Sequence, residues 1–420
     1  DYMSKKRMLI VTSVTLSVVT ISLGIVKLYQ TYALSNYIGT VTDTGIDVYI
    51  NDDSYASIPA NGSSNVYYML TNTNPGTVKY GVAYQTTSGV TVKVYDTSED
   101  PATGTIEEND KKYIKLHLEN KNSTNKTIEL STVLGYENGG DLVVPSGVTL
   151  VTDTYTPPPT AAEYITKLYT TASKTTVTNN SITYNTAPSV SLMNDRLGGT
   201  TTDLDGGNIR YYGASPNNYI YFNCSDYSNQ TSSTCETWRI IGVFDGKLKL
   251  IRGSQIGTYS WDNKDTSTGA ESNFGKNDWT TARLMKLLNP SDYYTTDSND
   301  NNLGQGLYYN SASGKCYSGQ NNATVDCNFT STGIKNDITR NMIAETTYNL
   351  GGWNSNTVYP NLMYEKERGT TVYTGRPTTP WTGKIALAYT SDYGYAADLN
   401  QCKDKTLYDY NNSTCTSNNW

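Results

Sequence analysis

The sequence predicts a chain of three parts: an N-terminal transmembrane helix, an all-β sandwich of immunoglobulin-like type, and an α+β domain with local disulfides. Three observations lead to this prediction. An uncharged apolar run lies near the N-terminus, apolar residues then recur at every second position, and cysteines occur in close pairs toward the C-terminus. The predicted boundaries are 1–36 for the cytoplasmic n-region with its membrane anchor or signal, 37–155 for the sandwich, 156–160 for a Pro-rich linker and 161–420 for the α+β domain.

The apolar run at residues 8–26 carries no charge. As a helix it reaches ~28 Å, close to the ~30 Å hydrocarbon core of a bilayer. Three basic residues at positions 5–7 precede the run and only Lys27 follows closely, so the positive-inside rule places the N-terminus in the cytoplasm. A cleaved signal peptide is the alternative, with residues 31–33 as its cleavage site. Both interpretations predict export, either as a single-pass membrane protein with an extracellular C-terminal part or as a secreted protein.

The composition argues against several classes of function. The single histidine, His117, leaves no two-His zinc site and few acid–base relays. The formal net charge of −7 disfavours a nucleic-acid partner, and no motif indicates a cofactor. Tyrosine is far more frequent than phenylalanine, with 37 residues against 4, which suits polar and hydrated binding surfaces.

The cysteines form three pairs that are close in sequence: Cys224 with Cys235, Cys316 with Cys327, and Cys402 with Cys415. Pairing between nearest neighbours closes three small loops without crossing, and each such disulfide contributes ~3 kcal/mol by constraining the unfolded chain. A zinc site would need CxxC spacing or histidine partners, which these segments lack. We therefore expect three structural disulfides, as is typical of an oxidising compartment.

Region 37–155 shows apolar residues at a period of two. The segment VTVKVYD at residues 90–96 alternates Val with Thr and Lys, and YIKLHLE at 113–119 alternates apolar residues with Lys and His117. This period predicts strands with one buried face and places His117 on the polar face as a solvated residue. Further strands are expected at 46–50, 66–70, 80–85, 127–134 and 143–151. About seven short strands are typical of an immunoglobulin-like sandwich, for which we expect a role as a stalk.

The α+β domain follows a linker that three prolines at 157–159 make stiff. A helix is expected directly after the linker, over 161–170, and Asp245-Gly246 predicts a hairpin turn. Helices are also expected near 280–288 and 335–350, with strand-like pieces at 307–309 and 384–396.

Four strings lie between residues 208 and 420: ETWRIIGVFDGKLKLIRGSQIGTYSWDN, NDWTTARLMKLLNP, GKCYSGQNNATVDCNFTSTGIKND and WTGKIALAYTSDYGYAADLNQC. Together they resemble a family of uncharacterised surface proteins of gut bacteria, whose C-terminal domain is similar to the C-type-lectin-like fold of formylglycine-generating-enzyme-type domains. The resemblance implies a C-type-lectin-like head, a binding or display role, and no established catalytic residues. It also implies that closing strands follow Trp420, so that the head is C-terminally truncated.

Two acidic segments are candidates for metal sites. Residues 297–302, DSNDNN, place oxygen atoms at alternate positions as a calcium loop does. However, the sixth position is Asn302 instead of Gly and the twelfth is Tyr308 instead of Glu, so a solvated loop is expected. Residues 203–207, DLDGG, are expected to form a turn. The sequence therefore assigns no metal site.

Glycoside hydrolysis requires only two carboxylates ~5–10 Å apart. The candidates by residue type are Glu236, Glu345, Glu365 and Glu367. No pair among them is favoured, so we expect no enzyme activity and keep a wall-associated glycan hydrolase as an alternative.

Two tryptophans are the preferred candidates for ligand contact. Trp353 in GGWNSN and Trp381 in TTPWTG lie in expected loops, where an indole ring can stack on a sugar. The leading hypothesis is a bacterial cell-surface protein that displays a lectin-like head on a β-sandwich stalk for adhesion or ligand binding. Its expected partner is an unidentified extracellular glycan or protein. A structural subunit of a surface filament is a further alternative.

Overall fold

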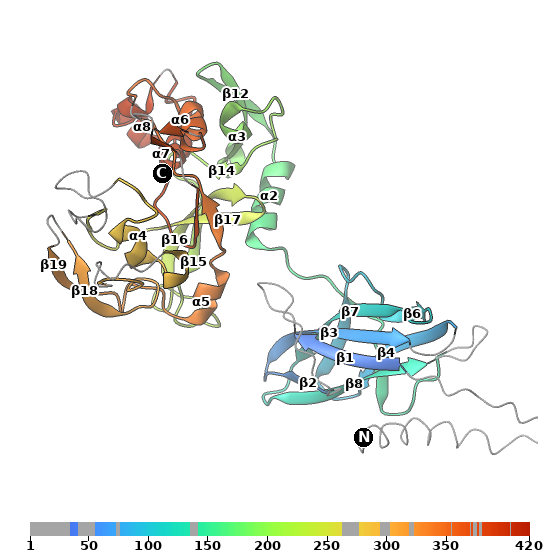
Figure 1. The fold of residues 1–420 in the computed structure, drawn as a ribbon. Coiled ribbons are helices and arrows are strands. Elements are labelled where there is room, and N and C mark those ends of the chain that lie inside the picture. The colour runs from blue at the N-terminus through green and yellow to red at the C-terminus, as the bar shows by residue number, and fades with distance from the viewer. Residues whose placement is uncertain are drawn as a thin grey trace, which may run out of the picture. The chain divides into compact units, whose positions relative to one another are not determined.

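The computed structural model divides the chain into two compact units, Asp1–Pro158 and Pro159–Trp420 (Figure 1). It describes residues 34–40, 55–72, 76–134, 142–262, 277–294, 303–318, 323–353, 355–369, 371–372, 376–377, 380–403 and 405–420. The predicted anchor at 8–26 and the predicted strand at 46–50 lie outside these residues. Within the described part, none of the helices combines the length and the apolar character of a membrane span.

The first unit consists of strands in its described part, arranged in two sheets. One sheet has the order β1-β3-β7-β5-β10, and the other has the order β2-β8-β4-β6 with β9 paired to β4. Neighbouring strands are antiparallel except for β10, which runs parallel to β5. The strands are β1 (Leu34–Thr40), β2 (Tyr55–Ile58), β3 (Gly62–Asn72), β4 (Val78–Gln85), β5 (Val90–Tyr95), β6 (Thr103–Ile106), β7 (Lys111–Asn120), β8 (Lys126–Leu134), β9 (Val148–Leu150) and β10 (Thr154–Tyr155).

The core of the first unit follows the period of two in the sequence. Ile114, Leu116 and Leu118 of β7 are fully buried, and they share one apolar core with Ile128 and Leu130 of β8 in the other sheet. Alternate residues of a strand point to opposite faces, so each strand contributes one apolar row to this core. For the described residues of 37–155, the all-β prediction is confirmed.

The prediction that His117 is solvated is wrong. The side chain points away from the apolar core, but the residue is only 5% exposed, because Tyr155 of β10 covers it. The two rings are stacked with centroids 3.6 Å apart, and Nδ1 of His117 lies 2.7 Å from Oδ1 of Asn65. Alternation marks the face on which a residue lies, but it does not show that a strand from a distant part of the sequence will cover that face.

The second unit is built around a seven-stranded sheet of order β11-β12-β13-β14-β16-β15, with β17 paired to β16. Its strands are β11 (Thr175–Asn179), β12 (Ile182–Ala187), β13 (Leu192–Asn194), β14 (Ile209–Tyr211), β15 (Tyr219–Phe222), β16 (Glu236–Phe244) and β17 (Lys247–Arg252). Two-stranded pairs are formed by β18 (Ser313–Tyr317) with β19 (Thr324–Asn328), β20 (Thr346–Tyr348) with β23 (Trp381–Gly383), and β21 (Thr371–Val372) with β22 (Arg376–Pro377). The helices are α2 (Ala161–Thr171), α3 (Arg196–Gly199), α4 (Arg283–Leu288), α5 (Asp337–Met342), α6 (Pro360–Glu367), α7 (Thr390–Ala396) and α8 (Ser413–Ser417).

Helix α2 forms where the sequence predicts it, directly after the prolines. Thr160 and Glu163 make reciprocal side-chain to backbone hydrogen bonds of 3.2 and 2.7 Å, which satisfy two N–H groups that a helix start leaves without partners. Ile165 and Tyr169 are buried in one cluster with Ile240 of β16. The helix therefore covers one face of the sheet near the β16–β17 hairpin, whose turn residues Asp245 and Gly246 both have the positive φ that a type I′ turn requires.

Three predicted elements of the second unit differ in the structure. The helix expected at 335–350 is limited to α5, because the chain then extends as β20 and pairs with β23. The strand expected at 307–309 lies in a series of turns. In 384–396 a helix, α7, forms instead of a strand, because Tyr389 and Asp392 cap its first turn. For 335–350 and 384–396, a pairing or capping partner outweighs the local apolar pattern.

The three disulfides are Cys224–Cys235, Cys316–Cys327 and Cys402–Cys415, as predicted from the spacing. Each closes a short loop inside the second unit, and all six cysteines are buried. The cystines therefore fasten neighbouring segments and do not connect distant ones.

The buried His117 predicts a pH dependence of the first unit. Burial lowers the pKa of His117 below 6.5, and nearby Glu119 offsets this effect only in part, while Lys93 adds to it. As the pH falls below 6.5, the unfolded chain binds a proton that the folded unit binds less readily, so the free energy of unfolding decreases. We expect lower hydrogen-exchange protection of β5 and β7 at pH 5.5 than at pH 7.5, after correction for intrinsic exchange. The H117Q variant should lose this difference, and equal protection of the unsubstituted chain at both pH values would contradict the prediction.

Candidate functional site

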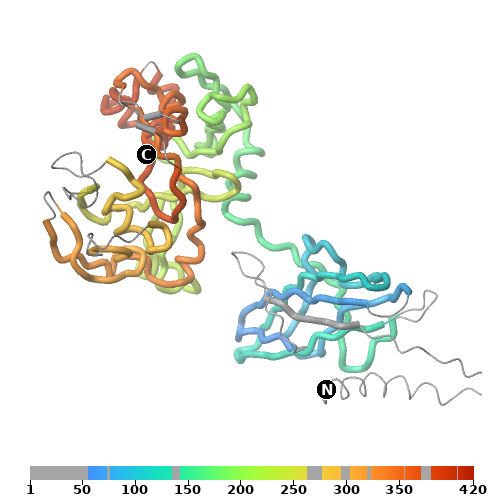
Figure 2. The backbone as a smooth tube through the Cα atoms, viewed as in Figure 1, coloured from blue at the N-terminus to red at the C-terminus, as the bar shows by residue number. Residues whose placement is uncertain are grey.

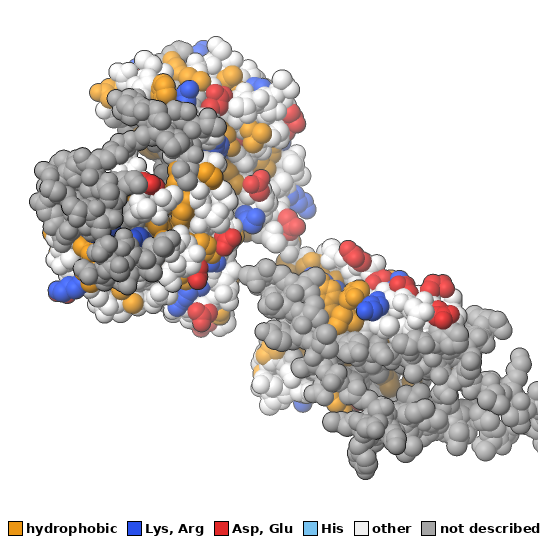
Figure 3. All heavy atoms as spheres, in the orientation of Figure 1, with side chains coloured by type: hydrophobic (Ala, Val, Ile, Leu, Met, Phe, Trp, Pro, Cys, Tyr) orange, Lys and Arg blue, Asp and Glu red, His pale blue; other side chains and the backbone are white. Residues whose placement is uncertain are grey.

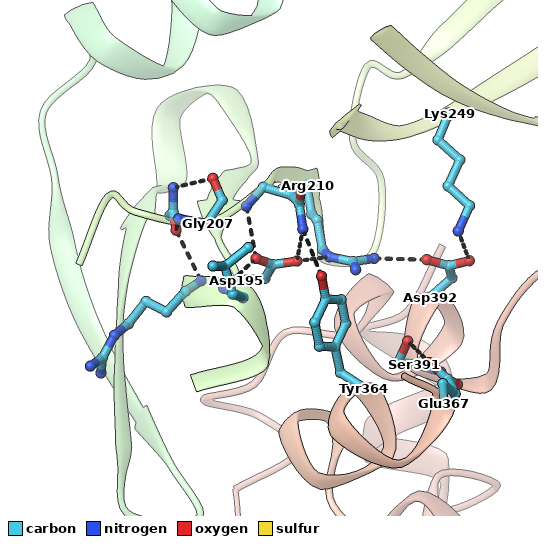
Figure 4. A network of polar contacts seen from close by, with 12 residues as sticks. Asp195, Gly207, Arg210, Lys249, Tyr364, Glu367, Ser391 and Asp392 are labelled. Atoms are coloured by element: carbon cyan, nitrogen blue, oxygen red, sulfur yellow. Dashed lines mark hydrogen bonds and ion pairs between the residues drawn. The ribbon is translucent and has the colours of Figure 1, made fainter. Parts of the chain in front are cut away.

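A buried ionic network of Asp195, Arg210, Asp392 and Lys249 joins distant parts of the second unit (Figure 4). Nε of Arg210 lies 2.5 Å from Oδ2 of Asp195, and Nη1 of Arg210 lies 2.8 Å from Oδ1 of Asp392. Nζ of Lys249 lies 2.5 Å from the other carboxylate oxygen of Asp392. Because Arg210 and both carboxylates are buried, each charge requires its partners to compensate for lost hydration.

The elements that carry the network lie far apart in the sequence. Asp195 follows β13, Arg210 belongs to β14 and Lys249 to β17, whereas Asp392 belongs to α7 near the C-terminus. Figure 2 shows the N-terminal part of this unit, in green, beside the C-terminal part, in red. The network therefore attaches the C-terminal helices to the sheet.

Asp195 also holds the loop that connects β13 with β14. Its carboxylate accepts hydrogen bonds from the backbone N–H groups of Leu197 and Asn208, at 2.9 and 2.8 Å, and from the side-chain amide of Asn208 at 2.9 Å. Arg196 and Leu197 both have φ near +50°, which is unfavourable for residues with a Cβ atom. The buried carboxylate thus stabilises a loop conformation that the backbone alone disfavours.

The charges around Asp392 keep its carboxylate ionised. Burial opposes ionisation, but Lys249 and Arg210 outweigh it and hold the pKa of Asp392 below 3.8. The aromatic rings of Phe244 and Tyr395 lie against the Arg210 guanidinium, with centroids 4.7 and 4.8 Å from Cζ. These contacts hold the Arg210 side chain in the interior of the unit, where the network has a structural role.

Glu367, a candidate for hydrolysis, lies beside this network and is buried. Its carboxylate accepts hydrogen bonds from the N–H and the hydroxyl of Ser391, at 2.9 and 2.5 Å. Burial raises the pKa of Glu367, and these hydrogen bonds and Arg368 offset the shift only in part. Figure 4 shows Ser391 and Glu367 directed at each other. Both residues are buried, so neither side chain is available to a substrate.

The other candidate carboxylates are separate from Glu367 and have different surroundings. Oε2 of Glu236 is 3.0 Å from both Nε of Arg252 and the indole nitrogen of Trp238. Glu345 accepts a hydrogen bond of 2.9 Å from the hydroxyl of Tyr293 at the surface. Glu365 is exposed on α6. The structure joins none of these carboxylates to another by a shared hydrogen-bond partner among the described residues.

The two tryptophans named from the sequence differ in their accessibility. Trp353 is 43% exposed, and Nζ of Lys366 lies 4.5 Å from the centroid of its ring. Trp381 is 5% exposed and packs between Trp279 and Tyr348 in an apolar core. Because only 5% of Trp381 is exposed, the prediction that this residue contacts a ligand conflicts with its position. The sequence predicts a loop at Trp381, but the residue belongs to β23, which pairs with β20 and directs the ring inward.

Of the two acidic segments, the structure describes only residues 203–207. Residues 203–207 form a turn, in which Oδ1 of Asp205 accepts hydrogen bonds from Tyr169 and Asn185. Residues 297–302 lie outside the described residues, and those described contain no cluster of three side chains able to hold a metal ion. On the face drawn in Figure 3, acidic and basic side chains of the second unit are scattered among uncharged ones.

Five side chains lie together on one face of strands β15, β16 and β17. We call this surface the tyrosine face. The tyrosine face consists of Tyr219, Tyr221, Thr237, Arg239 and Ile251. Tyr219, Arg239 and Ile251 are direct neighbours across the three strands, and Tyr221 lies opposite Thr237. Tyr219, Tyr221 and Ile251 are 58%, 39% and 37% exposed, so a ligand can reach their side chains.

The other side of the same strands fixes this face in place. Ile220, Ile240 and Leu250 point the opposite way and pack in the cluster that contains Ile165 and Tyr169 of α2. Side chains on one face of a sheet stand on a backbone whose position the opposite face determines. The tyrosine face is therefore a rigid platform.

The sequence contained a signal for this face that the tryptophan-based interpretation missed. The segment YIYF at 219–222 alternates tyrosine with Ile220 and Phe222, which indicates a strand with a tyrosine-bearing face. The position of Tyr219 opposite Arg239 could not be predicted from the spacing of residues, because the register depends on pairing between separate segments.

The comparisons with known proteins add no family. No protein-family model, curated protein or solved structure matches the chain.

The network predicts a large effect of removing one buried charge. Replacing Asp392 by Asn leaves Arg210 and Lys249 without their shared counter-charge, and we expect a loss of about 3–5 kcal/mol in the free energy of unfolding of the second unit. Urea unfolding followed by tryptophan fluorescence measures this loss. The control variant D326N removes the exposed ion pair with Lys315 and should change stability little. Equal stability of D392N and D326N would contradict the role assigned to the network.

Proposed function

We propose that this protein is an extracellular ligand-binding or adhesion protein of a bacterial surface. In this proposal a C-type-lectin-like head, residues 161–420, is displayed on an immunoglobulin-like stalk, residues 37–155. Residues 8–26 anchor the chain in the membrane, or the chain is secreted. The four sequence strings that resemble surface proteins of gut bacteria lie in the second unit, and its three disulfides are consistent with an oxidising compartment.

The tyrosine face is the observation that supports a binding role most strongly. Accessible tyrosines lose little conformational entropy on binding and offer both an aromatic ring and a hydroxyl. Here Tyr219 and Tyr221 stand on neighbouring positions of one face, supported from behind by the α2 core. Exposed aromatic rings on a sheet that is packed from behind suit the apolar face of a sugar ring, so we propose a glycan as the ligand.

We propose binding without catalysis. Glycoside hydrolysis needs two accessible carboxylates at a fixed separation. Glu367 is buried against Ser391, and Glu236 is engaged by Arg252, so neither is free to act as a general acid in the described structure. A binding protein needs no such pair.

Removing the two tyrosines tests the proposal. We expect the double variant Y219A/Y221A to bind mucin-type and bacterial-wall glycans at least about tenfold more weakly than the unsubstituted chain, since stacking contacts of this size contribute on the order of 1–2 kcal/mol. Immobilised glycan arrays probed with the disulfide-bonded full chain measure the change.

Tyr408 provides a matched control, because it is 72% exposed on the same unit but lies outside the tyrosine face. Y408A should bind as the unsubstituted chain does. The assignment of glycan binding to the tyrosine face would be contradicted if Y408A and Y219A/Y221A lost glycan affinity equally, or if the double variant lost none. Release of new reducing ends from a bound glycan would contradict the absence of catalysis.

A further inference from the structure

We infer that Arg239 is the specificity-determining residue of the tyrosine face and that it recognises the carboxylate of an acidic sugar. This inference rests on the proposed function of glycan binding and names the class of glycan. Its basis is a guanidinium in an accessible aromatic setting that is oriented by the protein but has no acidic partner among the described residues.

Arg239 differs from most arginines of the second unit in its electrostatic surroundings. Ion pairs with carboxylates are formed by Arg210, Arg252, Arg283, Arg340 and Arg368. Within the part of the chain that the structure describes, Arg239 is paired with no carboxylate. Its charge therefore remains available to an anion from outside the protein.

The orientation of the guanidinium is fixed by a buried amide. Nε and Nη2 of Arg239 donate hydrogen bonds of 3.0 and 2.8 Å to Oδ1 of Asn218. Asn218 is fully buried, and its own Nδ2 donates a hydrogen bond of 2.9 Å to the carbonyl of Ile240. Because Asn218 is neutral, it orients the guanidinium without neutralising it.

Two aromatic rings contact the Arg239 guanidinium. The centroids of Tyr219 and Trp420 each lie 4.6 Å from Cζ. Contacts of this kind hold a guanidinium in place through its attraction to the ring. A cation that is oriented before binding pays a smaller entropic cost when a ligand arrives.

The remaining donors of Arg239 match a carboxylate. A guanidinium carries five N–H groups, and the edge formed by Nε and Nη2 is directed at Asn218. The terminal edge, formed by Nη1 and the second N–H of Nη2, makes no hydrogen bond to a described residue. Two parallel N–H groups on one edge fit the two oxygens of a carboxylate.

The neighbours of Arg239 indicate that this carboxylate belongs to a sugar. Tyr219 and Tyr221 point to the same side of β15, about 7 Å apart along the strand, and the exposed Thr237 lies beside them. These side chains offer rings and hydroxyls to a pyranose whose acid group is held by Arg239. One cation in a chain with a net charge of −7 suits a single acidic residue and not a polyanion.

The test compares acidic and neutral glycans that are otherwise alike. The probes are 3′-sialyllactose with its carboxyl-reduced derivative, and methyl galacturonoside with methyl galactoside, titrated against the disulfide-bonded full chain by calorimetry. We expect one acidic probe to bind at least tenfold more tightly than its neutral counterpart. R239Q should lower the affinity for the acidic probe far more than the affinity for its neutral counterpart, so that the preference is lost. R239K should restore the preference only in part, because an ammonium group lacks the paired donors.

A second variant keeps the inference testable if R239Q fails to fold. T237D places a carboxylate on the tyrosine face, two positions from Arg239 on the same strand, and should reduce affinity for the acidic probe more strongly than affinity for its neutral counterpart. The matched T382D variant adds a charge at an exposed position of β23 and should change neither affinity.

The outcomes separate the inference from the proposed function. If acidic and neutral probes bind equally and T237D has no selective effect, the role of Arg239 is refuted while glycan binding stands. Equal binding of a sulfated lactose would refute the preference for a carboxylate. If the tyrosine-face variant Y219A/Y221A and the unsubstituted chain both bind no glycan on the arrays or in the titrations, the proposed function fails with the inference.

Discussion

The second unit depends on the burial of one guanidinium, that of Arg210. Removing such a charge from water costs several kcal/mol, and the cost is offset only when counter-charges and hydrogen bonds are in place together. Asp195 and Asp392 supply these counter-charges, and they come from near the beginning and near the end of the sequence of this unit. An arrangement in which the C-terminal helices leave the sheet would expose Asp392 and leave Arg210 short of one partner, so the native packing is strongly preferred over looser alternatives.

The two units reach a unique structure by different means. The first unit has long strands whose alternate residues fill one apolar core, so its register follows from hydrophobic pattern. The second unit has short strands and several smaller apolar clusters. Apolar pattern specifies register weakly in such short elements, and directional contacts such as those of Asp195 supply the missing specificity.

The sequence predicted the features that arise from local chemistry. The alternation in β5 and β7, the capped helix α2, the Asp245-Gly246 turn and the pairing of the cysteines all depend on residues that are close in the chain. The features that it missed depend on contacts between distant segments. Tyr155 covers His117, Tyr348 packs on Trp381, and Arg210 meets Asp392 across 182 positions, so none of these could be derived from spacing. The tyrosine face was predictable in part. The alternation in YIYF indicates strand β15, but the sequence does not show that Arg239 pairs with it.

The short span of the three cystines bears on how an exported chain would acquire its covalent bonds. Partners are separated by 11, 11 and 13 positions, and the three pairs follow one another without overlap. If the chain crosses a membrane with its N-terminus first, as the proposed export implies, each second thiol would emerge shortly after the first and well before the next pair arrives. Oxidation in order of emergence yields the native connectivity, so a chain of this design requires an oxidant but little help from an isomerase.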